Sequence, residues 1–166
     1  MLIAGAASAA LILTSAPGAN AYAYNGGRFG GANINFTSYG SYTDAWSNAG
    51  ANWSNLTDVN IGYTTSPSTN IIGNSQNRSD VSWDGLAVYP SVYNGVWQGG
   101  VSVYLNTYYV AGYSQQKRNG VANHEFGHAL GLSHVNNTAA VMHPTTSQRI
   151  YNVPRSDDIA GINAKY

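Results

Sequence analysis

Alternating polar and apolar residues mark two short strands in the first part of the chain. Residues 33–37 and 59–63 each show this alternation, which is typical of a half-buried β-strand. Between them, small and aromatic side chains recur at the spacing of one helical face; they are Ala45, Trp46, Ala49 and Trp53. A helix over 42–54 is therefore predicted, with Ser41 and Asp44 spaced as in a capping box at its start.

Two more strands follow after a polar stretch. Residues 64–81 are rich in Ser and Asn and contain a Pro, so we interpret them as a loop. Residues 86–89 and 101–105 are strand candidates. A turn rich in Gly and Asn over 94–100 separates them.

The last third of the chain predicts two helices. Ser114 is placed to cap a helix that continues to about Leu132, and Gly131 stands where a helix C-terminus favours glycine. Ser156 is placed to cap a final helix over 157–165, whose first two residues are aspartates that favour the positive end of the helix dipole. Strands followed by helices in this order indicate a layered α+β domain.

The N-terminus has the pattern of an export signal. Residues 2–14 form an apolar run too short to span a bilayer comfortably, and small residues then alternate towards Ala21 and Ala23. We predict a signal peptide over 1–23, cleaved after Ala21 or Ala23, and a single domain over 24–166. The signal is atypical because no basic residue precedes the apolar run; the alternative is an N-terminal anchor or a buried helix. We expect a secreted protein without an integral membrane segment in its mature form.

Charge is scarce in this chain and unevenly placed. Only 8% of the residues are charged, against about 25% in a typical domain. Seven basic residues balance seven acidic ones, which argues against nucleic-acid binding. The absence of cysteine excludes disulfides, thiolate zinc fingers and a cysteine nucleophile. All four histidines lie between His124 and His143, and Glu125 is the single glutamate.

These rare side chains form one motif with the spacing of a metal site. His124 and His128 are four residues apart, so on a helix both imidazoles lie on one face, one turn apart. Gly131 permits a sharp exit from the helix that can return His134 to the same metal. Three imidazoles and one open position describe a catalytic zinc site, because structural sites have four protein ligands. Glu125 lies beside this face, in reach of a reacting water.

The segment 124–134 resembles the zinc-binding motif of the metzincin metalloproteases, and within them the matrixins. Met142 and Pro144 resemble the turn that forms an apolar floor beneath the zinc in this family. Residues 156–166 are similar to the matrixin C-terminal helix, and 53–57 to the end of its first helix. The resemblance implies a zincin-like catalytic domain with a twisted mixed β-sheet, an active-site helix and a C-terminal helix.

Other matches and departures concern substrate and metal binding. Residues 86–90 are similar to the edge strand that holds substrate in the family, which makes Ala87 a candidate substrate contact. No histidine precedes His124, so the family's second, structural zinc is not expected. Calcium has no support in the sequence, because few acidic residues precede the motif and calcium needs about six to eight oxygens. Thr145 and Thr146 replace a tyrosine of the specificity pocket, so substrate preference cannot be transferred.

Our hypothesis is a monomeric, secreted endopeptidase with one catalytic zinc and protein or peptide substrates. His124, His128 and His134 are its predicted ligands, and Glu125 is its predicted general base. We interpret His143 as an exposed residue of the turn. Two alternatives stay open: a secreted binding or adhesion module that uses zinc only for stability, and a zinc amidase acting on cell-wall peptides.

Overall fold

The structure of the protein, a computed structural model, describes residues 22–66 and 68–166. Nearly all of the predicted signal peptide, including the possible cleavage site after Ala21, lies outside the described residues. In the described ranges, no helix combines the length and the apolar character that crossing a membrane requires.

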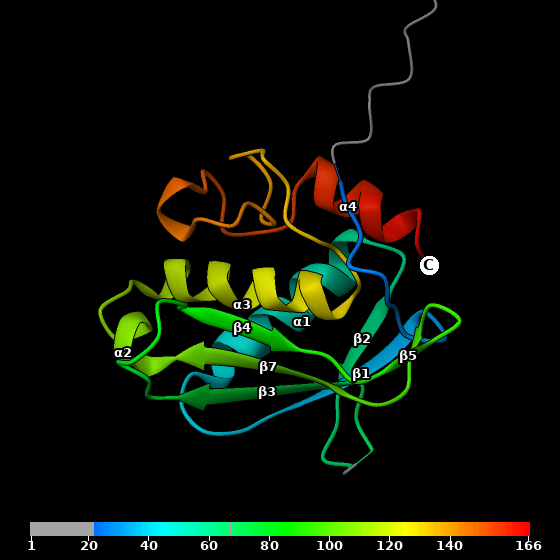
Figure 1. Ribbon diagram of the computed structural model, residues 1–166, viewed down its shortest axis with the longest axis horizontal. Coiled ribbons are helices and arrows are strands. Elements are labelled where there is room, and N and C mark those ends of the chain that lie inside the picture. Colours follow the sequence, from blue (N-terminus) through cyan, green and yellow to red (C-terminus); the bar gives the residue numbers. More distant parts are fainter. Residues whose placement is uncertain (1–21, 67) are drawn as a thin grey trace, which may run out of the picture.

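A five-stranded mixed sheet forms one layer of the fold (Figure 1). In spatial order its strands are β2 (Asn60–Tyr63), β1 (Asn33–Ser38), β3 (Ile71–Gln76), β7 (Val101–Asn106) and β4 (Gly85–Val88). The first four are parallel, whereas β4 pairs antiparallel with β7 and forms an edge. β5 (Val92–Tyr93) and β6 (Val96–Trp97) form a separate hairpin. Its turn residues Asn94 and Gly95 both have positive φ, as a type I′ turn requires. The range 94–100, predicted to be a turn, therefore consists of this tight turn followed by the short strand β6.

Helices cover one face of this sheet, and the C-terminal segment lies above the helices (Figure 1). The helices are α1 (Thr43–Leu56), α2 (Thr107–Val110), α3 (Gln115–Ala129) and α4 (Ser156–Asn163), with one 3₁₀ turn at Thr146–Gln148. α1 and α3 pack against each other, and α3 also packs on β4 and β7. The predicted α+β class, with a mixed sheet, a helix carrying the motif and a C-terminal helix, is confirmed.

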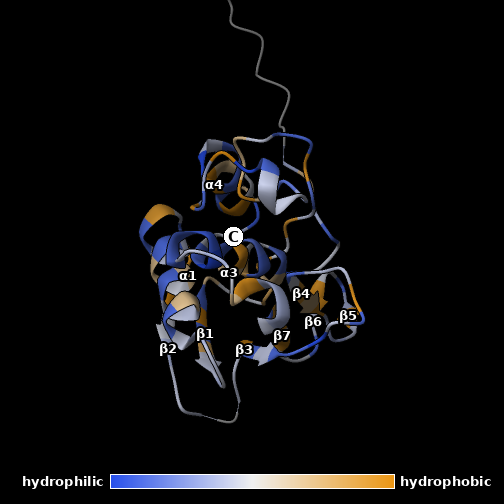
Figure 2. Ribbon diagram, turned by 90° about the vertical axis from the view of Figure 1, so that its left-hand side faces the viewer, coloured by the Kyte–Doolittle hydropathy of each residue, from blue (hydrophilic) through white to orange (hydrophobic). Residues whose placement is uncertain are grey.

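Aromatic residues form the core between the helices and the sheet. Trp46, Trp53 and Phe126 are fully buried, and the rings of Trp46 and Phe126 stack with centroids 5.9 Å apart. The Trp53 indole also donates a hydrogen bond to the carbonyl of Asn123 at 2.9 Å. α1 is therefore fixed to α3 directly beside the motif. Figure 2 shows hydrophilic residues along these helices and hydrophobic residues in β4, which packs against α3.

The interpretation of 64–81 as a loop is wrong, because this range contains the central strand β3. Its polar composition conceals a strand that β1 and β7 flank on both sides. Ile71 and Gly73 are buried, and a Cβ at Gly73 would lie 2.7 Å from the Trp46 ring. Glycine is therefore present for close packing, although it weakens the strand pattern in the sequence.

Helix starts and ends differ from the predictions in informative ways. Ser114 caps α3 as predicted, and its hydroxyl accepts the N–H of Lys117. The predicted cap at Ser41 is wrong, because Tyr42 precedes α1 and no side chain caps this helix. The predicted cap at Ser156 is also wrong: it is the first helical residue of α4. α3 ends at Ala129, earlier than predicted.

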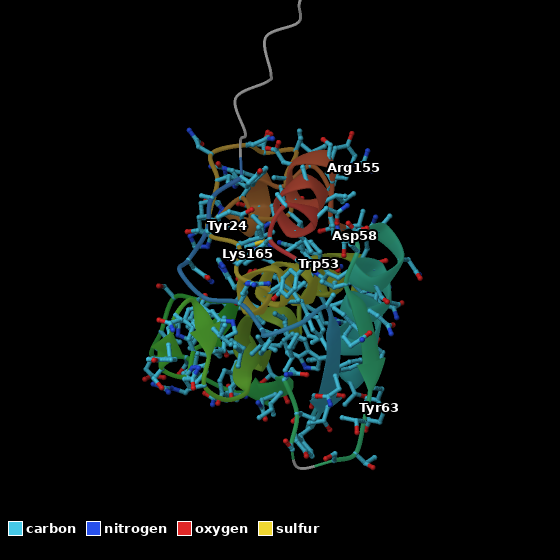
Figure 3. All side chains as sticks on the ribbon, turned by 90° about the vertical axis from the view of Figure 1, so that its right-hand side faces the viewer. Tyr24, Trp53, Asp58, Tyr63, Arg155 and Lys165 are labelled. Carbon is cyan, nitrogen blue, oxygen red and sulfur yellow. The ribbon has the colours of Figure 1, made fainter. Side chains whose placement is uncertain are left out.

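The segment that precedes β1 ties the C-terminal helix to the rest of the fold. The Tyr24 hydroxyl donates to the carbonyl of Gly161 at 2.9 Å, and the Lys165 ammonium lies 4.0 Å from the centre of the Tyr24 ring. Figure 3 shows Tyr24 and Lys165 close together near the end of the chain. The Arg28 guanidinium donates to the Lys165 carbonyl. These contacts hold α4 above α3 by hydrogen bonds and a cation–π contact, with no ion pair between the two segments among the described residues.

Candidate metal centre

Three imidazoles converge at the C-terminal end of α3. The Nε2 atom of His134 lies 3.1 Å from Nε2 of His124 and 3.1 Å from Nε2 of His128. α3 presents the first two, and the turn at Gly131 (φ 106°) brings back the third. The structure thus brings the three predicted ligand residues together, and their ring nitrogens form a group able to hold a metal ion.

Backbone carbonyls orient the two histidines on α3. Nδ1 of His124 lies 2.8 Å from the carbonyl of Val141, and Nδ1 of His128 lies 2.9 Å from that of Leu132. A carbonyl only accepts, so each Nδ1 carries the proton and each Nε2 keeps its lone pair for a metal. Burial lowers the pKa of His124 well below its usual range and that of His128 to about 4. Both rings are therefore neutral at pH 7, as metal ligands must be.

The donor set fits zinc in its chemistry and its spacing. Two ligands of a tetrahedral ion with bonds of about 2.05 Å lie roughly 3.3 Å apart, close to the two observed separations of 3.1 Å. Imidazole nitrogen is a ligand that zinc prefers. Three protein ligands leave a position open for water and substrate, which is the arrangement of catalytic zinc sites.

Glu125 lies beside the imidazoles with its carboxylate buried. Its side chain is only 4% exposed, and burial raises its pKa to about 8, with Arg149 opposing the shift and Asp84 adding to it. A Cβ at Gly85 of β4 would collide with Glu125 Oε1. Gly85 thus makes room for the carboxylate, a role that the sequence did not reveal because Gly85 is one of nineteen glycines.

Met142 packs against α3 as a buried apolar residue. It is 1% exposed, and a Cβ at Gly127 would collide with its sulfur. The Asp158 carboxylate of α4 accepts the N–H groups of Val141 at 2.9 Å and of Met142 at 3.2 Å. The Val141 carbonyl in turn orients His124. Asp158 therefore supports the site from α4, whereas the sequence suggested only a contribution to the helix dipole.

The fourth histidine differs from its interpretation as an exposed turn residue. His143 is 4% exposed, and its Nδ1 accepts the N–H of Thr145 at 3.2 Å. It is absent from the imidazole cluster. The Asx-like local bond gives it a structural role in the turn after Met142, and the interpretation as exposed is wrong.

A cleft of about 680 Å³ runs across the imidazoles and Glu125. Its walls include Ala87 from β4 and Pro144, both singled out in the sequence. Residues that no motif indicated also line it: Asn25, Asp84, Tyr109, Tyr113, Lys117 and Arg149. They come from four separate stretches of the chain, so only the fold brings them together.

Comparison with known proteins agrees with this geometry. A family model described as matrixin matches residues 33–166. Similar curated proteins include two from Homo sapiens: matrix metalloproteinase-20 is 47% identical over 49 residues, and neutrophil collagenase is 49% identical over 49 residues. Each match covers 28% of this chain and 10% of the relative. The chain thus spans about a tenth of the length of these relatives.

Proposed function

The chain belongs to the matrixin family, and from that premise we propose that it is a secreted zinc-dependent endopeptidase. Family membership supports metalloprotease activity, a hydrolase function. The observation that carries the finer proposal is the convergence of three Nε2 atoms beside the buried carboxylate of Glu125 within one open cleft. One zinc ion is the proposed cofactor, and a protein or peptide is the proposed substrate.

The three histidines hold the metal and Glu125 moves the proton. Zinc, when bound, supplies Lewis acidity that activates water and polarises a peptide carbonyl. Glu125 then accepts a proton from the attacking water and delivers it to the leaving amine. The position of its carboxylate between α3 and Gly85 restricts its motion, so it stays directed at the cleft. Proton transfer of this kind contributes about a hundredfold to ten-thousandfold in rate.

Substrate has an available backbone partner at the rim of the cleft. β4 is the edge strand of the sheet, and Ala87 on this strand lines the cleft. An extended peptide can add to such an edge through main-chain hydrogen bonds. We propose that the scissile segment binds here, alongside β4, with one carbonyl directed at the metal. Secretion is proposed from the apolar run and small residues of the N-terminus.

The test is a protease assay with the mature chain, loaded with zinc, on casein. We expect cleavage that a chelator abolishes and zinc restores. Glu125→Gln should retain stoichiometric zinc but lose about a thousandfold in rate. Asp157→Asn, at a residue of α4 that does not line the cleft, is the matched control and should cleave normally. Zinc binding without cleavage by the wild type would instead favour a zinc-stabilised binding module. Cleavage confined to cell-wall peptides would favour an amidase.

A further inference from the structure

One wall of the cleft carries positive charge that the proposed reaction does not use. Arg149 and Lys117 both line the cleft together with Glu125. Arg149 lies in the segment that follows Met142, and Lys117 lies in the first turns of α3. A basic wall is unexpected in a chain with seven basic residues in total.

Arg149 is partly buried, yet much of its hydrogen-bonding capacity is free. Its Nε donates to the carbonyl of His143 at 2.8 Å and its Nη1 to that of Gly120 at 3.3 Å. A guanidinium has five N–H donors, so three have no protein partner among the described residues. Nη2 donates to no protein atom among the described residues. It is not fully buried, so it retains contact with solvent.

No carboxylate of the described part of the chain is in contact with Arg149. Among the described residues, one pair of oppositely charged side chains has a nitrogen and an oxygen within 4.0 Å, and it joins Arg78 and Asp80 at the surface. Asp84 and Glu125 also line the cleft and their charges act on Arg149 through space, but neither contacts it; Asp84 accepts the Tyr113 hydroxyl at 3.1 Å. A desolvated guanidinium without a contacting anion is costly. An anionic guest would therefore gain more here than a neutral one.

Two further groups favour an anion at this wall. The Lys117 ammonium lies 3.8 Å from the centre of the Tyr113 ring, which holds its charge at the cleft. The Thr146 hydroxyl has no hydrogen-bond partner and belongs to a residue that lines the cleft, but it is fully buried, so a guest reaches it only after its side chain rotates. A carboxylate can accept from a guanidinium fork and from a hydroxyl at once. An apolar side chain would leave all of these donors unpaired.

We propose that this wall selects a carboxylate side chain, glutamate or aspartate, in the substrate residue next to the scissile bond, with Arg149 as its binding partner. The inference rests on the proposed protease function and narrows its substrate class. Arg149 is a specificity residue, and because its charge also lowers the pKa of Glu125, its role is read from a ratio of two substrates. A lysine or arginine at this substrate position would be repelled by the two cations.

The test begins with the wild-type protein, so it does not depend on the folding of a variant. Cleavage sites in a peptide library are mapped by mass spectrometry, and the best sequence is synthesised with Glu or Gln at the position next to the scissile bond. We expect enrichment of acidic residues at one such position and a kcat/KM at least tenfold higher for Glu than for Gln. Equal rates, or enrichment of apolar residues there, would overturn the inference and leave the protease function intact. If no peptide is cleaved, both proposals fail.

Variants then assign the selection to Arg149. Arg149→Gln should abolish the preference for Glu over Gln, and Arg149→Lys should retain part of it, because the charge remains but the fork is lost. A purely structural role would lower both rates equally and leave their ratio unchanged. Arg155→Gln removes the same charge outside the cleft and should keep the wild-type ratio. If Arg149 variants fold poorly, Lys117→Gln, at the start of α3, should still reduce the ratio measurably.

Discussion

His124 and His128 belong to a helix, whereas His134 belongs to the turn that follows it. On the helix, each Nδ1 is paired with a backbone carbonyl. His134 is exposed, and its Nδ1 has no partner among the described residues. The helical pair is therefore pre-oriented by two backbone carbonyls, one next to Met142 and one just after the end of α3. The third ligand depends on how the chain leaves the helix.

That exit is held from outside the motif. The N–H of Asn25 donates to the Gly131 carbonyl at 3.1 Å, and the N–H of Ser133 donates to the Ala23 carbonyl at 2.7 Å. The turn that carries His134 thus pairs with the segment before β1, which lies about a hundred residues away in sequence. Two ligand positions follow from the spacing along a helix, whereas the third also requires the segment before β1 to be in place. Four substitutions test this difference.

Gly131→Ala should have the largest effect, because it attacks the turn directly. Gly131 has φ 106°, and a Cβ there would collide with the Gly27 carbonyl. The strained conformation and the clash together should cost about 4 kcal/mol. Calorimetry should show a large fall in Tm. Gly112→Ala, whose Cβ would lie 3.9 Å from its nearest neighbour, is the control. Equal tolerance of both substitutions would contradict the role of the turn.

Asp158→Ala tests the support of the helical ligand. Removing this buried carboxylate leaves the N–H groups of Val141 and Met142 unpaired, at a cost of about 3 kcal/mol. Because the Val141 carbonyl orients His124, zinc affinity should also fall by about tenfold to a hundredfold. Competition with a chromogenic chelator measures this. Asp157→Ala, which loses only the Asn137 amide, should keep its zinc affinity. Unchanged affinity in Asp158→Ala would disprove the link.

Tyr166 gives the exit a dependence on alkaline pH. Its hydroxyl accepts the N–H of Phe29 and donates to the Leu130 carbonyl, each at 3.1 Å. Burial raises its pKa to about 12 from an ordinary value of 10.0. The folded state therefore keeps the proton where the unfolded chain loses it. The resulting stability is complete below pH 10 and is lost as the pH rises towards 12.

Tyr166→Phe should remove this term. Between pH 9 and pH 12 the stability advantage of the wild type over the variant should shrink by about 2 kcal/mol. Urea titrations at several pH values measure the difference. Tyr63→Phe, at an exposed position, is the control for the loss of a hydroxyl. An advantage that stays constant across this range would refute the assignment to Tyr166.

Asn25→Ala should have the smallest effect. Its side-chain amide donates to the His128 carbonyl at 2.8 Å, whereas its backbone bond to Gly131 would survive the substitution. Loss of one such bond should cost about 1 kcal/mol and should weaken zinc binding only severalfold. Asn33→Ala, at an exposed position of β1, is the control. A loss larger than that of Asp158→Ala would reverse the proposed order of the two supports.

The same division between local and distant structure explains what the sequence could predict. The strand β1, the helix α1 and the placement of His124 and His128 follow from spacing within a few residues. β3 was missed because its burial comes from β1 and β7 on either side, which no local pattern records. Arg149 was missed for a related reason, since only the fold places it at the cleft.

The supporting role of Asp158 was likewise hidden. Its position at the start of α4 suggested a favourable interaction with the helix dipole, but its carboxylate accepts N–H groups sixteen and seventeen residues earlier in the chain. The incorrect cap at Ser156 has the same origin, because the Asp158 carboxylate also accepts the N–H of Arg155 at 2.8 Å. A side chain that reaches back across a turn leaves no periodic signal.

The scarcity of ion pairs has a consequence for the conditions in which the fold can persist. One ion pair is found among the described residues, between the exposed side chains of Arg78 and Asp80. Exposed ion pairs contribute little to stability. The elements are instead joined by hydrogen bonds and aromatic packing, which salt screens weakly. We expect a Tm that hardly changes from dilute buffer to concentrated brine, a tolerance that requires no acidic surface of the kind found in halophilic proteins.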